Sequence, residues 1–381
     1  MLNMKTNKSI LVLNCGSSSI KFNIVSLDTE DFLLKGIAEN LNSDNPIISI
    51  ELSDKKLYKD YTLEQNNYEF AINFIVKTLK QYPEILNTIT GVGHRVVHGG
   101  EQFSKSVLIN NTVKQAIKDC FTLAPLHNPP NLLGIELSME AFANLPHVAV
   151  FDTAFHQTMP EKAFLYGTPY EWYEKYKVRR YGFHGTSHKY VTLKAAEILQ
   201  KPIEELALVS AHLGNGGSVC AVLNGKSVDT TMGLTPLEGI MMGTRSGDVD
   251  PSLPIYLKNT ANIDFEDCIN SLNKKSGLLG VSGISMDMRT LESEANNDNK
   301  KAILAIDLYC YKLAKHIASQ MVSLGRVDAL IFTGGIGENS SLIREKTTNY
   351  LNYLNLSKIL VIPTNEELMI AKDTFNIIKE D

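Results

Sequence analysis

Residues 9–27 read SILVLNCGSSSIKFNIVSL, and this stretch says most about the fold. An apolar run at residues 9–14 ends in a turn of small residues at 15–19, and residues 20–27 follow with loose apolar alternation. Short apolar runs on either side of a Gly- and Ser-rich turn predict two strands joined by a polar loop.

The same design returns farther along the chain. Residues 207–212 are apolar, residues 213–218 read LGNGGS, and residues 219–223 are apolar again. The dipeptide Asn224-Gly225 then predicts a tight turn into a third strand at residues 227–231. Two strand–turn–strand units favour a duplicated fold with one unit in each half.

Helical patterns lie between and after these units. Asn128 is expected to cap a helix that runs to about residue 143, with prolines in its first turn. Residues 302–324 carry apolar side chains at three- and four-residue spacing, which predicts a long amphipathic helix. A buried strand at 327–332 and a glycine loop at 333–339 follow. Alternating strands and helices indicate the α/β class.

Composition narrows the function classes. A chain of 381 residues usually forms two domains. The net charge of −5 argues against a general affinity for nucleic acid or anionic membranes. The five cysteines form no Cys-x-x-Cys pair and are expected to be free thiols in a reducing compartment. No apolar run reaches signal-peptide or membrane-span length, so the expected location is the cytoplasm.

The first turn has the residues of a phosphate site. Gly16 lets a ligand approach the backbone closely, Ser17 and Ser19 offer hydroxyls, and Lys21 adds positive charge. A polar β-turn would have the same composition. The segment is not a Walker A loop, which has a different spacing of glycine and lysine.

Two further glycine turns, at residues 212–218 and 334–340, also follow strands. Backbone N–H groups in such turns, and at the start of a following helix, attract phosphate. Each could be an ordinary loop, but three of them at strand ends favour nucleotide binding. The chain has no G-x-G-x-x-G, which argues against a Rossmann dinucleotide site.

Charged residues among small ones mark further candidates. Arg95 in GHRVVHGG and Arg245 in GTRSGDVDP suit recognition of carboxylate or phosphate. Asp152 emerges directly from an apolar strand, a good position for metal binding or catalysis, although most such aspartates are turn or cap residues. His184 and His188 have a zinc-like spacing, but a glycine interrupts it and no HExxH motif is present, so zinc is not expected.

Taken together, these segments resemble the acetate kinase family. The resemblance rests on VLNCGSSSIKF, GHRVVHGG, APLHNPPN, VFDTAFHQTMP, YGFHGTSH, HLGNGGS, GTRSGDVDP, DMR, FTGGIGEN and PTNEEL, which occur in the family's order along nearly the whole chain. It implies the acetate and sugar kinase/heat-shock/actin superfamily, with two RNase H-like domains flanking a nucleotide cleft. The expected domains are residues 1–151 with 367–381, and residues 152–366.

The resemblance also implies an activity and a set of residues. The expected reaction is reversible, Mg²⁺-dependent transfer (with Mn²⁺ as a substitute) of the ATP γ-phosphoryl group to acetate, giving acetyl phosphate and ADP, in a homodimer. The expected catalytic residues are Asp152, His184, Arg245 and Arg95. The expected substrate residues are Arg95 and a methyl pocket of Val97, Leu126, Phe183 and Pro236. The expected nucleotide residues, besides Ser17, Ser19 and Lys21, are His212, Leu213, Gly214, Asn215, Gly216, Asp287, Met288, Arg289, Gly335, Ile336, Gly337, Glu338 and Asn339. The expected Mg²⁺ residues are Asn14 and Glu366.

Two other functions stay open. Propionate kinases share these motifs, and Val97 in the methyl pocket is the feature that favours acetate. A non-metabolic ATP-switch protein of the same superfamily would need no carboxylate pocket. The chain is also shorter than expected of the family between residues 353 and 361, ahead of Pro363.

Overall fold

The chain folds into two compact units. The computed structural model describes residues 8–53, 55–354 and 356–380. Unit 1 comprises Met1–Ala154 and Asn365–Asp381, and unit 2 comprises Phe155–Thr364. These limits differ from the expected domains only at residues 152–154 and 365–366, which belong to unit 1.

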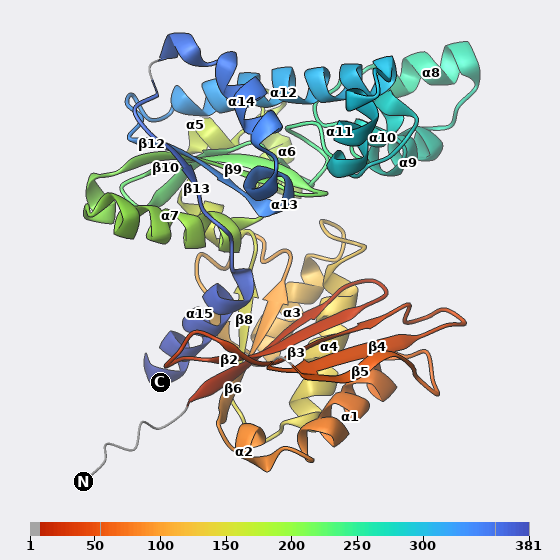
Figure 1. The fold of residues 1–381 in the computed structure, drawn as a ribbon, viewed down its shortest axis with the longest axis vertical. Helices are drawn as coiled ribbons and strands as arrows, with labels where there is room; N and C mark the ends of the chain where they lie inside the picture. Colours follow the sequence, from red (N-terminus) through yellow and green to blue (C-terminus); the bar gives the residue numbers. More distant parts are fainter. Residues whose placement is uncertain (1–7, 54, 355, 381) are drawn as a thin grey trace. The chain divides into compact units, whose positions relative to one another are not determined.

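Unit 1 is built on an eight-stranded sheet in the order β5-β4-β3-β2-β1-β6-β8-β7 (Figure 1). The strands are β1 (Ser9–Cys15), β2 (Ile20–Ser26), β3 (Phe32–Glu39), β4 (Ile47–Leu52), β5 (Lys55–Thr62), β6 (Ile89–Val96), β7 (Val107–Leu108) and β8 (His147–Phe151). Strands β1 to β5 are antiparallel neighbours, whereas β6 runs parallel to β1 and β8 parallel to β6. The largely exposed, lysine-rich β5 forms one edge, where charge discourages pairing with other chains.

Helices cover both faces of this sheet. They are α1 (Tyr68–Leu79), α2 (Pro83–Leu86), α3 (Asn111–Asp119), α4 (Asn128–Ala141) and α15 (Glu366–Glu380). Val92 of β6 packs into the apolar cluster that includes Ile72 of α1. Its neighbours Gly91 and Gly93 point to the opposite face, toward α15. A Cβ on Gly93 would lie 2.4 Å from Thr374 Oγ1, so the close approach of α15 depends on glycine there.

Unit 2 has a five-stranded sheet in the order β11-β10-β9-β12-β13. The strands are β9 (Ala207–Leu213), β10 (Gly217–Leu223), β11 (Lys226–Thr230), β12 (Ala329–Thr333) and β13 (Ile359–Val361). The helices are α5 (Glu161–Phe164), α6 (Tyr170–Tyr176), α7 (Gly185–Leu199), α8 (Leu253–Ala261), α9 (Phe265–Lys274), α10 (Gly277–Ser282), α11 (Met288–Asn296), α12 (Lys300–Met321), α13 (Gly334–Asn339) and α14 (Ser341–Asn349). Short 3₁₀ helices are η1 (Ala154–Thr158), η2 (Ile203–Glu205) and η3 (Asn352–Leu354).

The predicted duplication is confirmed by the order of the strands. In unit 1 the run β3-β2-β1-β6-β8 has three antiparallel strands followed by two parallel ones. In unit 2 the run β11-β10-β9-β12-β13 has the same order and directions. Both units therefore have the RNase H-like arrangement, and in each the first two strands along the chain form one of the two predicted strand–turn–strand units.

Two local predictions are wrong. Asn128 is the first residue of α4, and its N-cap is His127. The Asn128 side chain is buried and accepts a hydrogen bond from His98 N at 3.1 Å while donating to His98 O at 2.9 Å, so it joins two segments of unit 1. The glycine segment expected as a loop forms the six-residue helix α13, because Gly334 takes the left-handed conformation (φ 77°) that starts it directly after β12.

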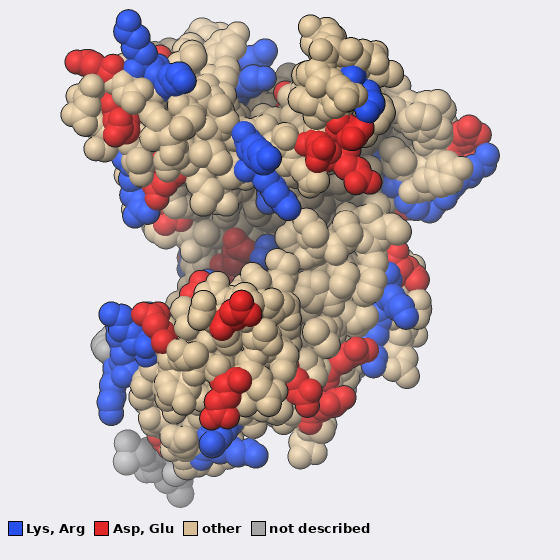
Figure 2. Space-filling view, turned by 90° about the vertical axis from the view of Figure 1, so that its right-hand side faces the viewer, with Lys and Arg blue, Asp and Glu red and all other residues tan. Residues whose placement is uncertain are grey.

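Few residues separate η3 from β13 ahead of Pro363. The 3₁₀ helix η3 ends at Leu354, and β13 begins at Ile359 beside β12. Among the described residues, no helix is long and apolar enough to cross a bilayer. Acidic and basic side chains are interspersed over the face shown in Figure 2.

Candidate active site

In unit 1, Arg95 and Asp152 form a tightly bonded pair. Arg95 is near the end of β6, and Asp152 directly follows the neighbouring parallel strand β8. The Arg95 Nε lies 3.2 Å from both Asp152 oxygens, and Nη2 lies 2.6 Å from Oδ2. Asp152 is buried, and its charge raises the pKa of Arg95. The pair presents a fixed cation at the carboxyl ends of two parallel strands, a common place for ligands.

Glu366, the first residue of α15, adds an unusual carboxyl group. Burial raises its pKa to about 7; Arg95 opposes this shift, and the charges of Asp152 and Glu367 add to it. Glu367 also forms an ion pair with Lys21 of β2, whose side chain is half exposed. Lys21, expected at the nucleotide, thus has a carboxylate partner within unit 1.

Asn14 and Glu366, the two expected Mg²⁺ residues, offer the amide and carboxylate oxygens that suit a divalent cation. Asn14 lies on β1 with its Cα opposite Lys21 of β2. Burial and two neighbouring carboxylates disfavour ionised Glu366, and a cation would relieve that repulsion. Within residues 8–53, 55–354 and 356–380, no group of three His, Cys, Asp or Glu side chains could hold a metal. Magnesium often takes only one or two protein ligands and keeps water and phosphate oxygens, so two are sufficient.

Asn131 of α4 holds two candidate segments together, and sequence reasoning did not single it out as a site residue. Its Nδ2 donates to Cys15 O at 2.6 Å, at the start of the Ser-rich turn, and its Oδ1 accepts from Val97 N at 3.0 Å. The turn itself is closed by a 2.8 Å bond from Gly16 N to Ser19 O. The sequence contained one signal for Asn131, which is the last residue of the APLHNPPN segment.

The four expected methyl-pocket residues are divided between the units. Val97 is buried in unit 1, where Leu126 is 63% exposed. Phe183 is buried in unit 2, and Pro236 also lies in that unit. Pro236 O accepts a hydrogen bond from Arg245 at 3.3 Å.

Unit 2 contains a cavity of about 590 Å³ where expected nucleotide residues meet. It is lined by Gly214, Asn215, Met286, Asp287, Met288, Arg289, Glu292, Gly335, Ile336, Asn339 and Ser340. Three chain segments expected at the nucleotide therefore share one cavity. Met286, Glu292 and Ser340 were not among the expected nucleotide residues, although Ser340 ends the glycine turn at 334–340; Glu292 and Ser340 are hydrogen-bonded to each other.

The other expected nucleotide residues of unit 2 have supporting or neighbouring positions. Glu338 Oε1 accepts hydrogen bonds from Gly334 N at 2.9 Å and Thr364 N at 3.1 Å, so it fixes the start of α13. The start of α13 lies close against the end of β9. A Cβ on Gly334 would lie only 2.8 Å from Leu213 O, so this close approach depends on glycine. Gly337 is buried, and the His212 ring stacks on His184 with centroids 4.3 Å apart.

Arg245 and His184 meet beside the glycine turn of unit 2. A Cβ on Gly216 would lie 3.5 Å from both Arg245 Nη1 and His184 Nε2. Arg245 contacts Pro236 O and Met242 Sδ, and in the part of the chain that the structure describes it has no carboxylate partner. Burial lowers its pKa. A shielded arginine without a counter-charge, beside exposed backbone and an imidazole, is suited to bind an oxyanion.

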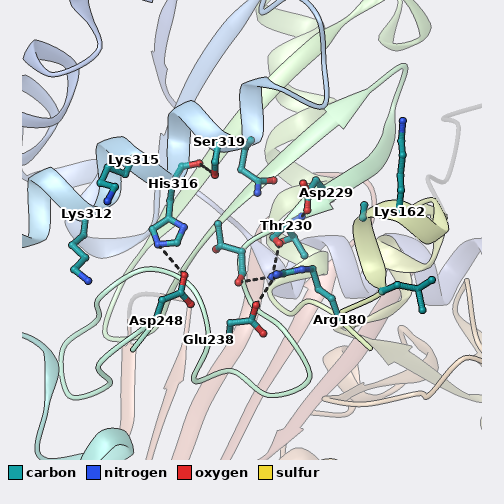
Figure 3. A pocket seen from close by; sticks show the side chains of 14 residues that line it. Lys162, Arg180, Asp229, Thr230, Glu238, Asp248, Lys312, Lys315, His316 and Ser319 are labelled. Carbon is teal, nitrogen blue, oxygen red and sulfur yellow. Dashed lines mark hydrogen bonds and ion pairs between the residues drawn. The ribbon is translucent and has the colours of Figure 1, made fainter. Parts of the chain in front are cut away.

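The loop that carries Pro236 and Arg245 also carries Glu238 and Asp248, whose side chains contact other segments of unit 2 (Figure 3). Arg180 donates to Thr230 O at 2.9 Å and Thr231 O at 2.8 Å, and its other terminal nitrogen lies 2.6 Å from Glu238. Asp248 accepts from Gly239 N at 2.7 Å and faces His316 of α12 at 3.6 Å. These side chains line a polar cavity of about 580 Å³ that sequence reasoning missed, because Arg180 and His316 are far in sequence from the loop that holds Glu238 and Asp248.

The chain is similar to known proteins over nearly its whole length. The Acetokinase family profile matches residues 9–358. The chain is 47% identical to the acetate kinase of Carboxydothermus hydrogenoformans over 97% of its own length and 99% of the relative's. The crystal structure of Porphyromonas gingivalis acetate kinase matches with 40% identity and a TM-score of 0.92, covering 97% of this chain and all 100% of that one. A propionate kinase from Francisella tularensis matches with 45% identity, the same TM-score and the same coverage.

Proposed function

The chain belongs to the acetokinase family, and from that premise we propose that it transfers the γ-phosphoryl group of ATP to acetate, reversibly, giving acetyl phosphate and ADP. Arg245 is the observation that carries the proposal. It is a shielded cation without a carboxylate partner among the described residues, beside His184 and the Gly216 turn. A phosphoryl group in transfer would supply the missing negative charge.

The chemistry needs positioning and charge neutralisation more than a strong base. Acetate is already ionised near neutral pH, because simple carboxylic acids titrate at about 4 to 5. A carboxylate oxygen attacks the γ-phosphorus, and the bond from phosphorus to the ADP oxygen breaks, with ADP taking the electron pair. This direct, in-line transfer leaves no phosphate on the protein.

Each candidate residue has a role in this scheme. Arg95 binds the acetate carboxylate, and Asp152 orients Arg95 through the contacts that it makes with the guanidinium. Arg245 takes up charge on the transferring group, and His184 donates a hydrogen bond from Nε2 to one of its oxygens. The cavity lined by Asp287, Met288 and Ile336 receives the nucleotide.

Magnesium is part of the proposal. Asn14 and Glu366 would hold Mg²⁺, with Mn²⁺ as a substitute, and the ion would supply positive charge to the nucleotide phosphates. We also place the enzyme in the cytoplasm as a homodimer. The five cysteines are all buried and free, which fits a reducing compartment.

The test is acyl phosphate formation from Mg-ATP, trapped with hydroxylamine, with acetate, propionate and butyrate in parallel. The highest kcat/KM for acetate supports the proposal. No acyl phosphate from any acid, with ATP still bound, would overturn it and favour an ATP-switch protein. A labelled phosphate that stays on the protein after ATP is removed would overturn the direct transfer.

Propionate is the second candidate substrate. The relative from Francisella tularensis, 45% identical to this chain, is a propionate kinase, so the fold is compatible with either substrate. One methylene changes binding by only about 1–3 kcal/mol, so some activity with propionate is expected in any case. A higher kcat/KM for propionate in the same assay would keep the mechanism and change the substrate.

A further inference from the structure

His184 is held by a chain of serine hydroxyls and imidazoles in unit 2. Its Nδ1 lies 2.9 Å from Ser218 Oγ, and the same oxygen lies 2.8 Å from His188 Nε2. The His188 Nδ1 in turn lies 2.7 Å from Ser210 Oγ. Ser218, His188 and Ser210 all have 0% exposure, so water does not replace these partners.

The chain restricts where the protons are. The Ser218 hydroxyl has one hydrogen, so it donates to only one of the two rings that meet at its oxygen. Burial lowers the pKa of His188 well below the ordinary histidine value, and the nearby His156 and His212 lower it further. His188 is therefore neutral, and one of its nitrogens donates while the other accepts.

One arrangement serves phosphoryl transfer and satisfies every atom of the chain. Ser210 donates to His188 Nδ1, His188 Nε2 donates to Ser218 Oγ, and Ser218 donates to His184 Nδ1. His184 then carries its proton on Nε2, the nitrogen near Gly216 and Arg245. The reversed arrangement would leave Nε2 of a neutral His184 without a proton, facing an anionic oxygen.

The His184 ring is also held in orientation. Its backbone is in the left-handed region (φ 57°), which is uncommon for a residue other than glycine and is often found at functional sites. The ring stacks on His212, with an interplanar angle of 28°. His212 Nδ1 lies 2.8 Å from Ser187 Oγ, which itself lies 2.8 Å from Thr364 Oγ1. A ring flip that exchanged Nδ1 and Nε2 would break the contact between Nδ1 and Ser218 Oγ.

We propose that Ser218 is a positioning residue that fixes His184 in the tautomer with its proton on Nε2, and that His188 aids it by orienting the Ser218 hydroxyl. The inference rests on the proposed function, since it explains how His184 donates to the phosphoryl oxygen. Ser218 itself touches neither substrate nor nucleotide in this scheme.

The first test observes the tautomer directly. Nitrogen-15 NMR of histidine-labelled protein without ligands distinguishes protonated from unprotonated ring nitrogens, and His184→Gln assigns the signals. The expected result is an unprotonated Nδ1 and a protonated Nε2 on His184. A neutral His184 with its proton on Nδ1 would overturn the inference. This outcome is separate from failure of the proposed function, which appears as absence of acyl phosphate from the unaltered protein.

The second test uses variants. Ser218→Ala should lower kcat about tenfold, the loss expected for one hydrogen bond, with the KM for acetate nearly unchanged and a mixed His184 tautomer. Ser218→Thr, which keeps the hydroxyl, should retain more activity and the wild-type signals. Wild-type kcat with wild-type His184 signals in Ser218→Ala would overturn the inference. If neither variant folds, the spectrum of the unaltered protein decides alone.

Ser227 provides a matched control. It is also a fully buried serine of the same sheet, and its Oγ lies 2.8 Å from Nδ1 of the buried His156. Ser227→Ala removes the same kind of hydrogen bond from His156, whose ring lies edge-on to that of His188 but whose hydrogen bonds go to Ser227 and Phe183 O. The His184 signals and kcat should both be unchanged. Equal losses in Ser227→Ala and Ser218→Ala would show a general effect of packing and contradict the assigned role.

Discussion

At the scale of single residues, the two arginines differ in what surrounds them. Arg95 has its charge balanced by Asp152 at 2.6 Å, whereas Arg245 contacts only a carbonyl and a sulfur among the described polar partners. Asp152 already neutralises Arg95, so a second anion gains less from that guanidinium than an anion that reaches the unpaired, shielded Arg245. We therefore expect Arg95 to contribute to binding and Arg245 to the transition state.

Arg245→Ala should lower kcat by about 10²–10³-fold, or 3–4 kcal/mol, the usual loss when a transition-state donor is removed. The KM for acetate should change far less. Steady-state kinetics in the acyl phosphate assay would check this. Arg326→Ala is the control, because Arg326 is half exposed and its carboxylate partner is Asp328. An unaltered kcat in Arg245→Ala would remove the residue from the mechanism.

Val97→Ala should move the preference toward propionate. Val97 is buried, and Asn131 holds its backbone N in place. The shorter side chain should therefore leave empty space, with the backbone where it was. We expect the ratio of kcat/KM for propionate to that for acetate to rise about tenfold, within the 1–3 kcal/mol typical of one methylene. Val107→Ala on the edge strand β7 is the control and should leave the ratio as it is.

The sequence predicted residue types better than residue partners. Arg245 was selected for its small neighbours, and the structure adds that no described carboxylate pairs with it. The Arg95–Asp152 pair joins residues far apart in the chain, so neither local motif contained it. The same is true of Asn131 and Ser218, whose importance depends on distances between segments and not on composition.

At the scale of elements, the packing of α15 on β6 depends on two glycines. Gly93→Val should destabilise unit 1 by about 1–3 kcal/mol, since its side chain would overlap Thr374 and Ile370 of α15. The free energy of unfolding in urea measures the loss. Gly167→Ala is the control, because a Cβ there meets nothing within 4 Å. Equal stability of the two variants would mean that α15 adjusts its position at no cost.

Helices and strands could be predicted where the apolar residues of a segment followed one clear pattern. The strands β1, β2, β9 and β10 and the helix α12 were predicted within a few residues. Predictions failed where a long-range contact decided the local structure. The Asn128 side chain bonds to His98 instead of capping its helix, and Gly334 begins α13 where several glycines suggested a loop.

At the scale of the whole molecule, buried histidines should make the fold sensitive to acid. Burial lowers the pKa of His94, His147, His156 and His188, for His156 to about 4. In the unfolded chain histidines titrate near 6.5, so below that pH the unfolded state binds more protons than the folded state. This contribution to stability is complete above about pH 6.5 and is lost as the pH falls.

We expect the free energy of unfolding in urea to be lower at pH 5.5 than at pH 7.5, because the four histidines together outweigh Glu366, whose raised pKa acts in the opposite direction. Each such histidine contributes up to about 1.4 kcal/mol per pH unit in this window. Repeating the measurement at high salt separates this effect from surface ion pairs, which salt screens. Equal stability at the two pH values would show that these rings are protonated in the folded protein.

The duplicated architecture was visible in the sequence because the first two strands of each sheet form the same strand–turn–strand unit. The later strands of each sheet were less visible. The edge strand β5 is polar and mostly exposed, the opposite edge strand β7 has two residues, and β13, at an edge of the other sheet, has three. Their place depends on neighbouring strands, which composition does not show.

The five buried, free cysteines can report on the local stability of the protein. Cys15 and Cys120 belong to unit 1, and Cys220, Cys268 and Cys310 to unit 2. A thiol reagent can reach them only when the surrounding structure opens, so the order in which they are alkylated follows the order in which the parts open. Mass spectrometry of the labelled peptides would therefore time the opening of each half in the native protein, without any engineered label.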